Sequence, residues 1–124
     1  MGRLWVAIAS LMLIAPSTVA AHAYLVKSIP ARRAVLFKAP AKIQLWFNER
    51  LEARFSSLSV IRSDGKRVDS GSVEVGADDP KRLSVDAEPL LPGNYIVKFR
   101  VLSVDGHVVE DEFPFTVREF RSRP

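Results

Sequence analysis

Short stretches of alternating apolar and polar residues, separated by Pro, Gly and Asp, make up the chain from residue 22 onward. Ile43, Leu45 and Phe47 occupy alternate positions, which predicts a strand with one face in a core. Further strand candidates are residues 58–61, 66–69, 73–75 and 82–86. No stretch carries the 3.6-residue period of an amphipathic helix, so the pattern predicts an all-β domain.

The last third of the chain has the strongest strand pattern. Residues 94–104 are rich in aromatic and β-branched side chains, and residues 108–117 follow after a short break. The two segments are expected to pair as a long hairpin. Tyr95 follows Pro92-Gly93, which suits a tyrosine corner, where the hydroxyl bonds back to upstream backbone. An ordinary core tyrosine is the alternative, and the sequence leaves both open.

Turn signals separate the strand candidates. Ser63-Asp64-Gly65-Lys66 contains the Asp-Gly pair of a tight hairpin, because Gly adopts a positive φ without steric cost. Six or seven short strands in about 100 residues predict two packed antiparallel sheets, as in an immunoglobulin or cupredoxin sandwich. We find no linker, internal repeat or second domain in the pattern.

The first 21 residues are set apart from this domain. Arg3 is followed by an apolar run over residues 4–15, and residues 17–21 are small. This order is typical of a secretory signal peptide, and the run is shorter than the roughly 18 to 20 residues of a transmembrane helix. We therefore expect residues 1–21 to be a cleaved signal peptide and residues 22–124 to be one exported domain.

The amino-acid composition limits the kinds of metal site and partner that this domain can have. The sequence has no cysteine, so a disulfide framework and a thiolate metal site are both excluded. Removal of Arg3 with the signal peptide leaves 17 basic and 14 acidic residues, a net charge of +3. This charge is too small to indicate a nucleic-acid partner. A monomer is expected.

The two histidines are the candidate metal ligands. Cleavage after Ala21 would make His22 the first residue, and its amine and imidazole Nδ1 could then close a chelate ring on one ion. His107 lies in Asp105-Gly106-His107, where residues i and i+2 of an extended segment point to the same side. An amine, two imidazoles and one carboxylate oxygen suit Cu(II), which prefers tetragonal nitrogen and oxygen ligation. The alternative for Asp105-Gly106 is a plain hairpin turn, with His107 on the surface.

Several further motifs recur in the order known from one family. They are His22-Ala23 with Leu25, Ser28 and Pro30, then residues 43–49 (IQLWFNE), 91–95 (LPGNY) and 100–107 (RVLSVDGH). With these motifs the sequence resembles the CopC (PcoC-like) copper-resistance proteins of bacterial periplasms. The resemblance spans nearly all of the chain after the signal peptide, and its ligands and framework occur in the same order.

The resemblance implies a seven-stranded Greek-key sandwich or barrel that carries copper. Cu(II) would be held by His22, Asp105 and His107. Members of the family also have a glutamate near that site, and Glu49 matches its position. Glu49 would be either an axial ligand or a carboxylate that contacts the ligands without binding the ion. The alternative for Glu49 is a solvated charge at a strand end. Some members carry a methionine-rich Cu(I) site, whereas both methionines of this chain, Met1 and Met12, lie in the signal peptide.

Three functions are compatible with these residues. The first is a periplasmic Cu(II) carrier or buffer, which is not an enzyme and has a membrane copper importer or another periplasmic copper protein as its candidate partner. The second is a small histidine-brace copper monooxygenase, although about 100 residues leave little room for a substrate face. The third is a structural adaptor with incidental metal binding, which would follow if cleavage removed His22.

Overall fold

Two four-stranded sheets pack face to face in the computed structural model, which describes residues 2–4, 10, 12 and 23–119. The strands are β1 (Leu25–Ile29), β2 (Val35–Leu36), β3 (Lys42–Phe47), β4 (Ser57–Arg62), β5 (Asp69–Val75), β6 (Arg82–Ala87), β7 (Gly93–Leu102) and β8 (Val108–Val117), with one 3₁₀ turn, η1 (Ala53–Phe55). The predicted all-β sandwich is confirmed, with eight strands rather than seven. In this part of the chain no helix is long and apolar enough to cross a membrane.

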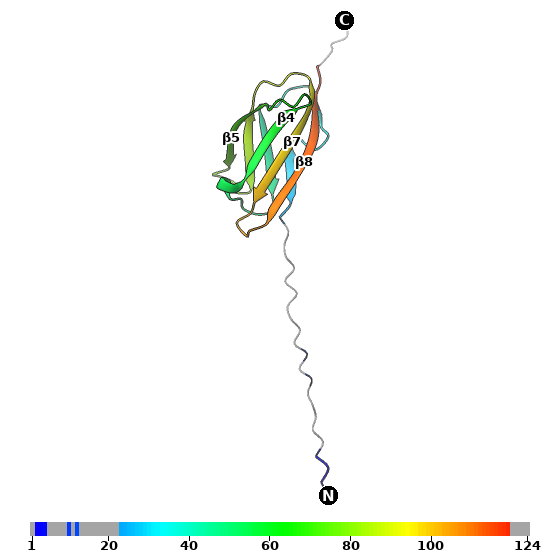
Figure 1. The fold of residues 1–124 in the computed structure, drawn as a ribbon, viewed down its shortest axis with the longest axis vertical. Helices are drawn as coiled ribbons and strands as arrows, with labels where there is room; N and C mark the ends of the chain where they lie inside the picture. The colour runs from blue at the N-terminus through cyan, green and yellow to red at the C-terminus, as the bar shows by residue number, and fades with distance from the viewer. Residues whose placement is uncertain (1, 5–9, 11, 13–22, 120–124) are drawn as a thin grey trace.

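The order of the strands is that of an immunoglobulin-like sandwich. One sheet has the order β1-β3-β6-β5 and the other β2-β8-β7-β4 (Figure 1), so the chain crosses between the sheets after each of the first four strands and again after β6. β7 and β8 pair along their full ten-residue lengths, which confirms the predicted hairpin. The two-residue β2 runs parallel to β8, whereas the sequence predicted antiparallel pairs only.

The core consists of the inward side chains of both sheets. On β3, the alternating Ile43, Leu45 and Phe47 are all buried, as their spacing predicts. β7 and β8 supply most of the other half. Their buried residues are Tyr95, Val97, Phe99, Val101, Phe113, Phe115 and Val117.

Tyr95 forms a tyrosine corner. Its hydroxyl donates a hydrogen bond to the carbonyl oxygen of Leu91, four residues upstream, and its ring stacks on Phe115 with centroids 5.2 Å apart. Burial raises the pKa of the Tyr95 hydroxyl. Of the two interpretations that the sequence left open, the structure supports the corner, which fixes the entrance to β7.

Three local predictions differ from the structure. Residues 66–68 do not form a strand, although an isolated bridge joins Ile61 to Arg67, and Asp69 is the first residue of β5. Ser70-Gly71, expected to separate two strands, lies within β5, where the register shifts between Asp69 and Val73. β1 and β2 were not predicted at all. Each lies at the edge of its sheet with few buried side chains, so neither has a strong alternating pattern.

A buried carboxylate joins β4 to the start of β5. The side chain of Asp69 is fully buried, and it accepts hydrogen bonds from Val60 N, Gly71 N and Arg67 Nε, all at 2.9 Å. Burial alone raises the pKa of Asp69, but the bonds from Arg67, Val60 and Gly71 outweigh it and hold the pKa below its ordinary value. This stabilisation is complete above the unfolded-state pKa of about 3.9 and is lost as the pH falls through the folded-state pKa.

Asp69→Ala is expected to lower the free energy of unfolding at pH 7 by about 2 to 3 kcal/mol, because it leaves buried amide groups without an acceptor. Urea denaturation followed by Trp fluorescence measures the change, and the gap between parent and variant should narrow below about pH 4. The control is Asp86→Ala. Asp86 is 70% exposed and 3.8 Å from Lys42 Nζ, so its loss should cost less than about 0.5 kcal/mol. Equal effects of the two variants would contradict the role of Asp69.

Candidate metal centre

Three segments far apart in sequence meet at the end of the sandwich where the chain enters β1. An isolated antiparallel bridge between Leu51 and Ser103 joins the chain after β3 to the β7–β8 turn. The chain after β3 also contacts the segment before β1, because Asn48 N donates to Tyr24 O at 3.2 Å. Side chains from residues 23–24, 48–52 and 103–107 are therefore held near one another by backbone pairing.

The β7–β8 turn runs from Ser103 to His107. Gly106 N donates to Ser103 O and Ser103 N donates to His107 O, both at 2.9 Å, and Gly106 has a φ of +86°. This is a tight turn closed by a one-residue bulge, with Gly at the position that needs a positive φ. The prediction of an extended segment through Asp105 is wrong, because Asp105-Gly106 forms the turn itself.

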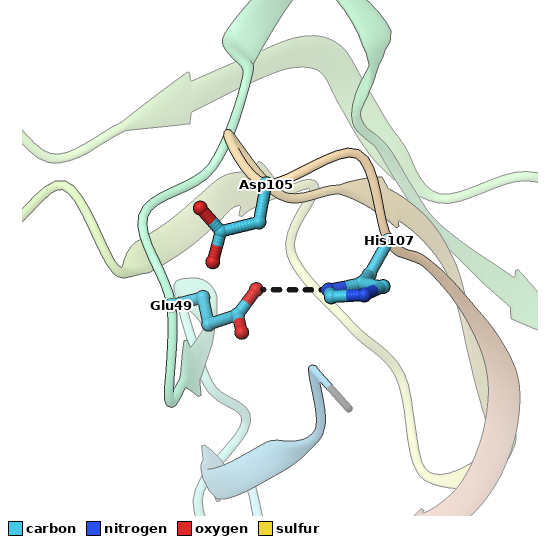
Figure 2. A group of neighbouring side chains, drawn as sticks. All are labelled: Glu49, Asp105 and His107. Atoms are coloured by element: carbon cyan, nitrogen blue, oxygen red, sulfur yellow. Dashed lines mark ion pairs between the residues drawn. The ribbon is translucent and has the colours of Figure 1, made fainter. Parts of the chain in front are cut away.

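The turn nevertheless brings its two polar side chains together with a third. Glu49, Asp105 and His107 each offer one ligand atom, and these atoms all lie within 4.8 Å of one another. Figure 2 shows Asp105 and His107 reaching from the turn towards Glu49, which follows β3. Glu49 Oε2 is 3.6 Å from His107 Nδ1.

Glu49 is not a solvated strand-end charge. Its side chain is only 10% exposed, against 37% for His107, and Oε2 is buried with no hydrogen bond among the described residues. A buried carboxylate oxygen is costly unless a cation or a donor satisfies it. Glu49 Oε2 therefore lies where a cation or a donor would satisfy it, beside His107 Nδ1.

His22, the remaining predicted ligand, lies outside the described residues. The described chain resumes at Ala23, which is buried, and Tyr24 is fixed by two bonds to Asn48. One is the backbone bond given above, and the other runs from Tyr24 N to Asn48 Oδ1 at 2.7 Å. Sequence reasoning missed this clamp, although Asn48 belongs to the motif that carried the resemblance.

The donor set suits a borderline divalent metal ion. Nitrogen and oxygen ligands lie about 2.0 to 2.2 Å from an ion such as Zn²⁺, so two ligands on opposite sides are about 4.4 Å apart. The ligand atoms of Glu49, Asp105 and His107 all lie within 4.8 Å of one another, which is within a few tenths of an ångström of that separation. One imidazole and two carboxylates contain no soft sulfur donor, which favours divalent ions over Cu(I).

Comparison with known proteins identifies the family. The model of the CopC domain matches residues 25–118. The chain belongs to the CopC family. The resemblance inferred from the motifs is thereby confirmed, and those motifs include the positions of all three clustered side chains.

Relatives and solved structures agree with this assignment. Copper transport protein CutJ of Bacillus subtilis is 34% identical over 93% of this chain, which spans only 21% of CutJ. The crystal structure of CopC from Methylosinus trichosporium OB3b is 38% identical, with a TM-score of 0.75 over 83% of this chain and 100% of that one. PcoC, a methionine-rich copper resistance protein from Escherichia coli, is 35% identical, with a TM-score of 0.69 over 79% and 100%.

Proposed function

We propose that this protein is a periplasmic carrier that holds one Cu(II) ion at Glu49, Asp105, His107 and an N-terminal His22. The convergence of the first three side chains where the described chain enters β1 carries the proposal. Family membership supports copper as the cargo, because relatives are named for copper transport or copper resistance. A membrane copper importer or another periplasmic copper protein is the proposed partner.

The contribution of His22 depends on removal of residues 1–21. Consecutive Cα atoms are 3.8 Å apart, so a residue joined to Ala23 is tethered close to the Tyr24–Asn48 clamp. Asn48 is in turn adjacent to Glu49 in the sequence. A new amine at His22 would add two nitrogens to the cluster, its own and the imidazole Nδ1.

The donor count favours a carrier over an oxygen-activating enzyme. Amine, two imidazoles and the carboxylates of Asp105 and Glu49 would provide four equatorial donors and one axial donor. Metal-ion catalysis needs an open coordination position for the reacting molecule. With both carboxylates bound, no equatorial position would remain open for a reacting molecule.

One equivalent of Cu(II) is expected to bind tightly to the exported protein, with visible and electron paramagnetic resonance spectra typical of nitrogen and oxygen ligation. Binding of Cu(I) should be weaker by orders of magnitude, because cysteine is absent and both methionines precede His22. Intact mass first establishes that the protein begins at His22. Titration with each oxidation state, with a chelator as competitor, then measures the two affinities.

Two results would contradict the proposal. The first is an exported protein that begins at His22 and binds no tight equivalent of Cu(II). The second is Cu(I) binding as tight as Cu(II) binding, which would point to a redox shuttle with a different ligand set. Zn²⁺ is the control ion, and Cu(II) should exceed it in affinity, as the Irving–Williams order requires for a nitrogen and oxygen site.

A further inference from the structure

The chain contains two Asp-Gly turns with the same backbone hydrogen bonds. In the β7–β8 turn these bonds join Ser103 to Gly106 and to His107, as described above. In the turn after β4, Gly65 N donates to Arg62 O and Arg62 N donates to Lys66 O, both at 2.8 Å. Gly65 has a φ of +89°, close to that of Gly106. The two turns therefore share these two backbone bonds but carry different side chains.

The two turns differ in the side chain that accepts a hydrogen bond from the backbone amide of their last residue, which is Lys66 in one turn and His107 in the other. In the first turn, Lys66 N donates to Asp64 Oδ1 at 3.1 Å, so the aspartate closes on its own turn. The Arg62 guanidinium and the Lys66 amide lower the pKa of Asp64 to about 2. In the second turn, the equivalent amide of His107 donates to Ser103 Oγ, also at 3.1 Å.

We propose that Ser103 is a positioning residue that directs the Asp105 carboxylate away from its own turn and towards the metal site. A backbone amide has one hydrogen to donate, so the serine hydroxyl and the aspartate compete for it. At the β7–β8 turn the Ser103 hydroxyl accepts the hydrogen bond from the His107 amide. The Asp105 carboxylate lies near Glu49 and the His107 side chain instead. This inference rests on the proposed function, in which Asp105 is a ligand.

The surroundings of Ser103 favour its hydroxyl over the Asp105 carboxylate as the acceptor for the His107 amide. Ser103 is only 1% exposed, and its backbone is held by the bridge to Leu51 and by the bond to His107 O. The hydroxyl is therefore fixed next to the His107 amide before any ion arrives. Arg62, at the same position of the other turn, has no hydroxyl, and its guanidinium binds Asp64 instead.

Ser103→Ala is expected to weaken Cu(II) binding by about 10- to 100-fold, the usual effect of losing a group that orients a ligand. In a crystal structure of the metal-free variant, an Asp105 carboxylate oxygen should lie near the His107 amide, at the 3.1 Å seen between Asp64 and Lys66. Ser84→Ala is the matched control, because Ser84 is also buried but lies on β6. It should leave Cu(II) affinity unchanged.

The other turn tests the same competition without copper and at an exposed position. Arg62→Ala should leave the bond from Lys66 to Asp64 in place, whereas Arg62→Ser supplies a hydroxyl that takes the Lys66 amide. The pKa of Asp64, followed by NMR, should be higher in Arg62→Ser than in Arg62→Ala by roughly 0.5 to 1 pH unit. This size follows because two or three such bonds lower a carboxylate pKa by about 2 units.

The outcomes separate this inference from the proposed function. An unchanged Cu(II) affinity and an unmoved Asp105 carboxylate in Ser103→Ala would overturn the role of Ser103. Equal Asp64 pKa values in the two Arg62 variants would overturn the competition on which that role depends. If the parent protein binds no Cu(II), the proposed function fails, while the Asp64 measurement still decides the competition.

Discussion

A protein with one extra residue before His22 is expected to bind Cu(II) about a thousandfold more weakly, or worse, than a protein that begins at His22. The added peptide bond converts the chelating amine into an amide, so a donor and its chelate ring are lost together. A thousandfold loss corresponds to about 4 kcal/mol, a modest part of the free energy with which proteins hold structural metal ions. Competition titration against a chelator of known affinity measures the loss.

The matched control is one extra residue after Pro124, at the other end of the chain. It changes length and mass equally but leaves the amine of His22 intact, so Cu(II) affinity should equal that of the parent. Equal affinity of the protein extended before His22 would rule out ligation by the amine. The metal would then depend on Glu49, Asp105 and His107 alone.

Substitution of His107 should cost far more Cu(II) affinity than substitution of Asp105. His107→Ala removes an equatorial nitrogen and is expected to weaken binding by about 100-fold or more, whereas Asp105→Asn keeps an oxygen donor and should cost about tenfold. Neither side chain belongs to the core, so the free energy of unfolding should change by less than about 1 kcal/mol. Titration and urea denaturation of both variants measure these effects.

The repeated turn again supplies the control. Asp64→Asn changes an aspartate at the same position of a turn with the same backbone bonds, on the connection that follows β4. It should leave Cu(II) affinity unchanged. If His107→Ala binds Cu(II) like the parent, His107 is an ordinary surface residue, and the Asp105-Gly106 pair serves only as a turn.

Strands with alternating buried side chains were predictable from the sequence, and β1 and β2 were not. Ile43, Leu45 and Phe47 alternate with less buried residues along β3, and the same alternation of burial continues along β7 and the second half of β8. β1 pairs on one side only, with exposed residues on much of its length, and β2 has two residues. Their pairing depends on neighbours far along the chain, which no local pattern contains.

At the site, the types of donor atom were predictable from the sequence, whereas the burial and the contacts of the residues were not. The Asp-Gly-His motif pointed to a nitrogen and oxygen centre, and its two side chains do converge. The burial of Glu49 follows from tertiary packing, so a strand-end charge and a buried carboxylate look alike in the sequence. The side chain of Asn48 accepts a hydrogen bond from the backbone amide of Tyr24, 24 residues away in the sequence. Such a contact between distant residues produces no periodic pattern in the sequence.

The length and direction of β8 place the cluster of Glu49, Asp105 and His107 far from the end of this strand. β8 leaves the Asp-Gly-His turn and runs ten residues to Val117, about 30 Å at the usual rise per residue. Anything joined beyond Val117, such as a reporter domain, a surface linker or the rest of a longer chain, is attached at the far end of the sandwich. An attachment at that end therefore leaves the end with Glu49, Asp105 and His107 unobstructed.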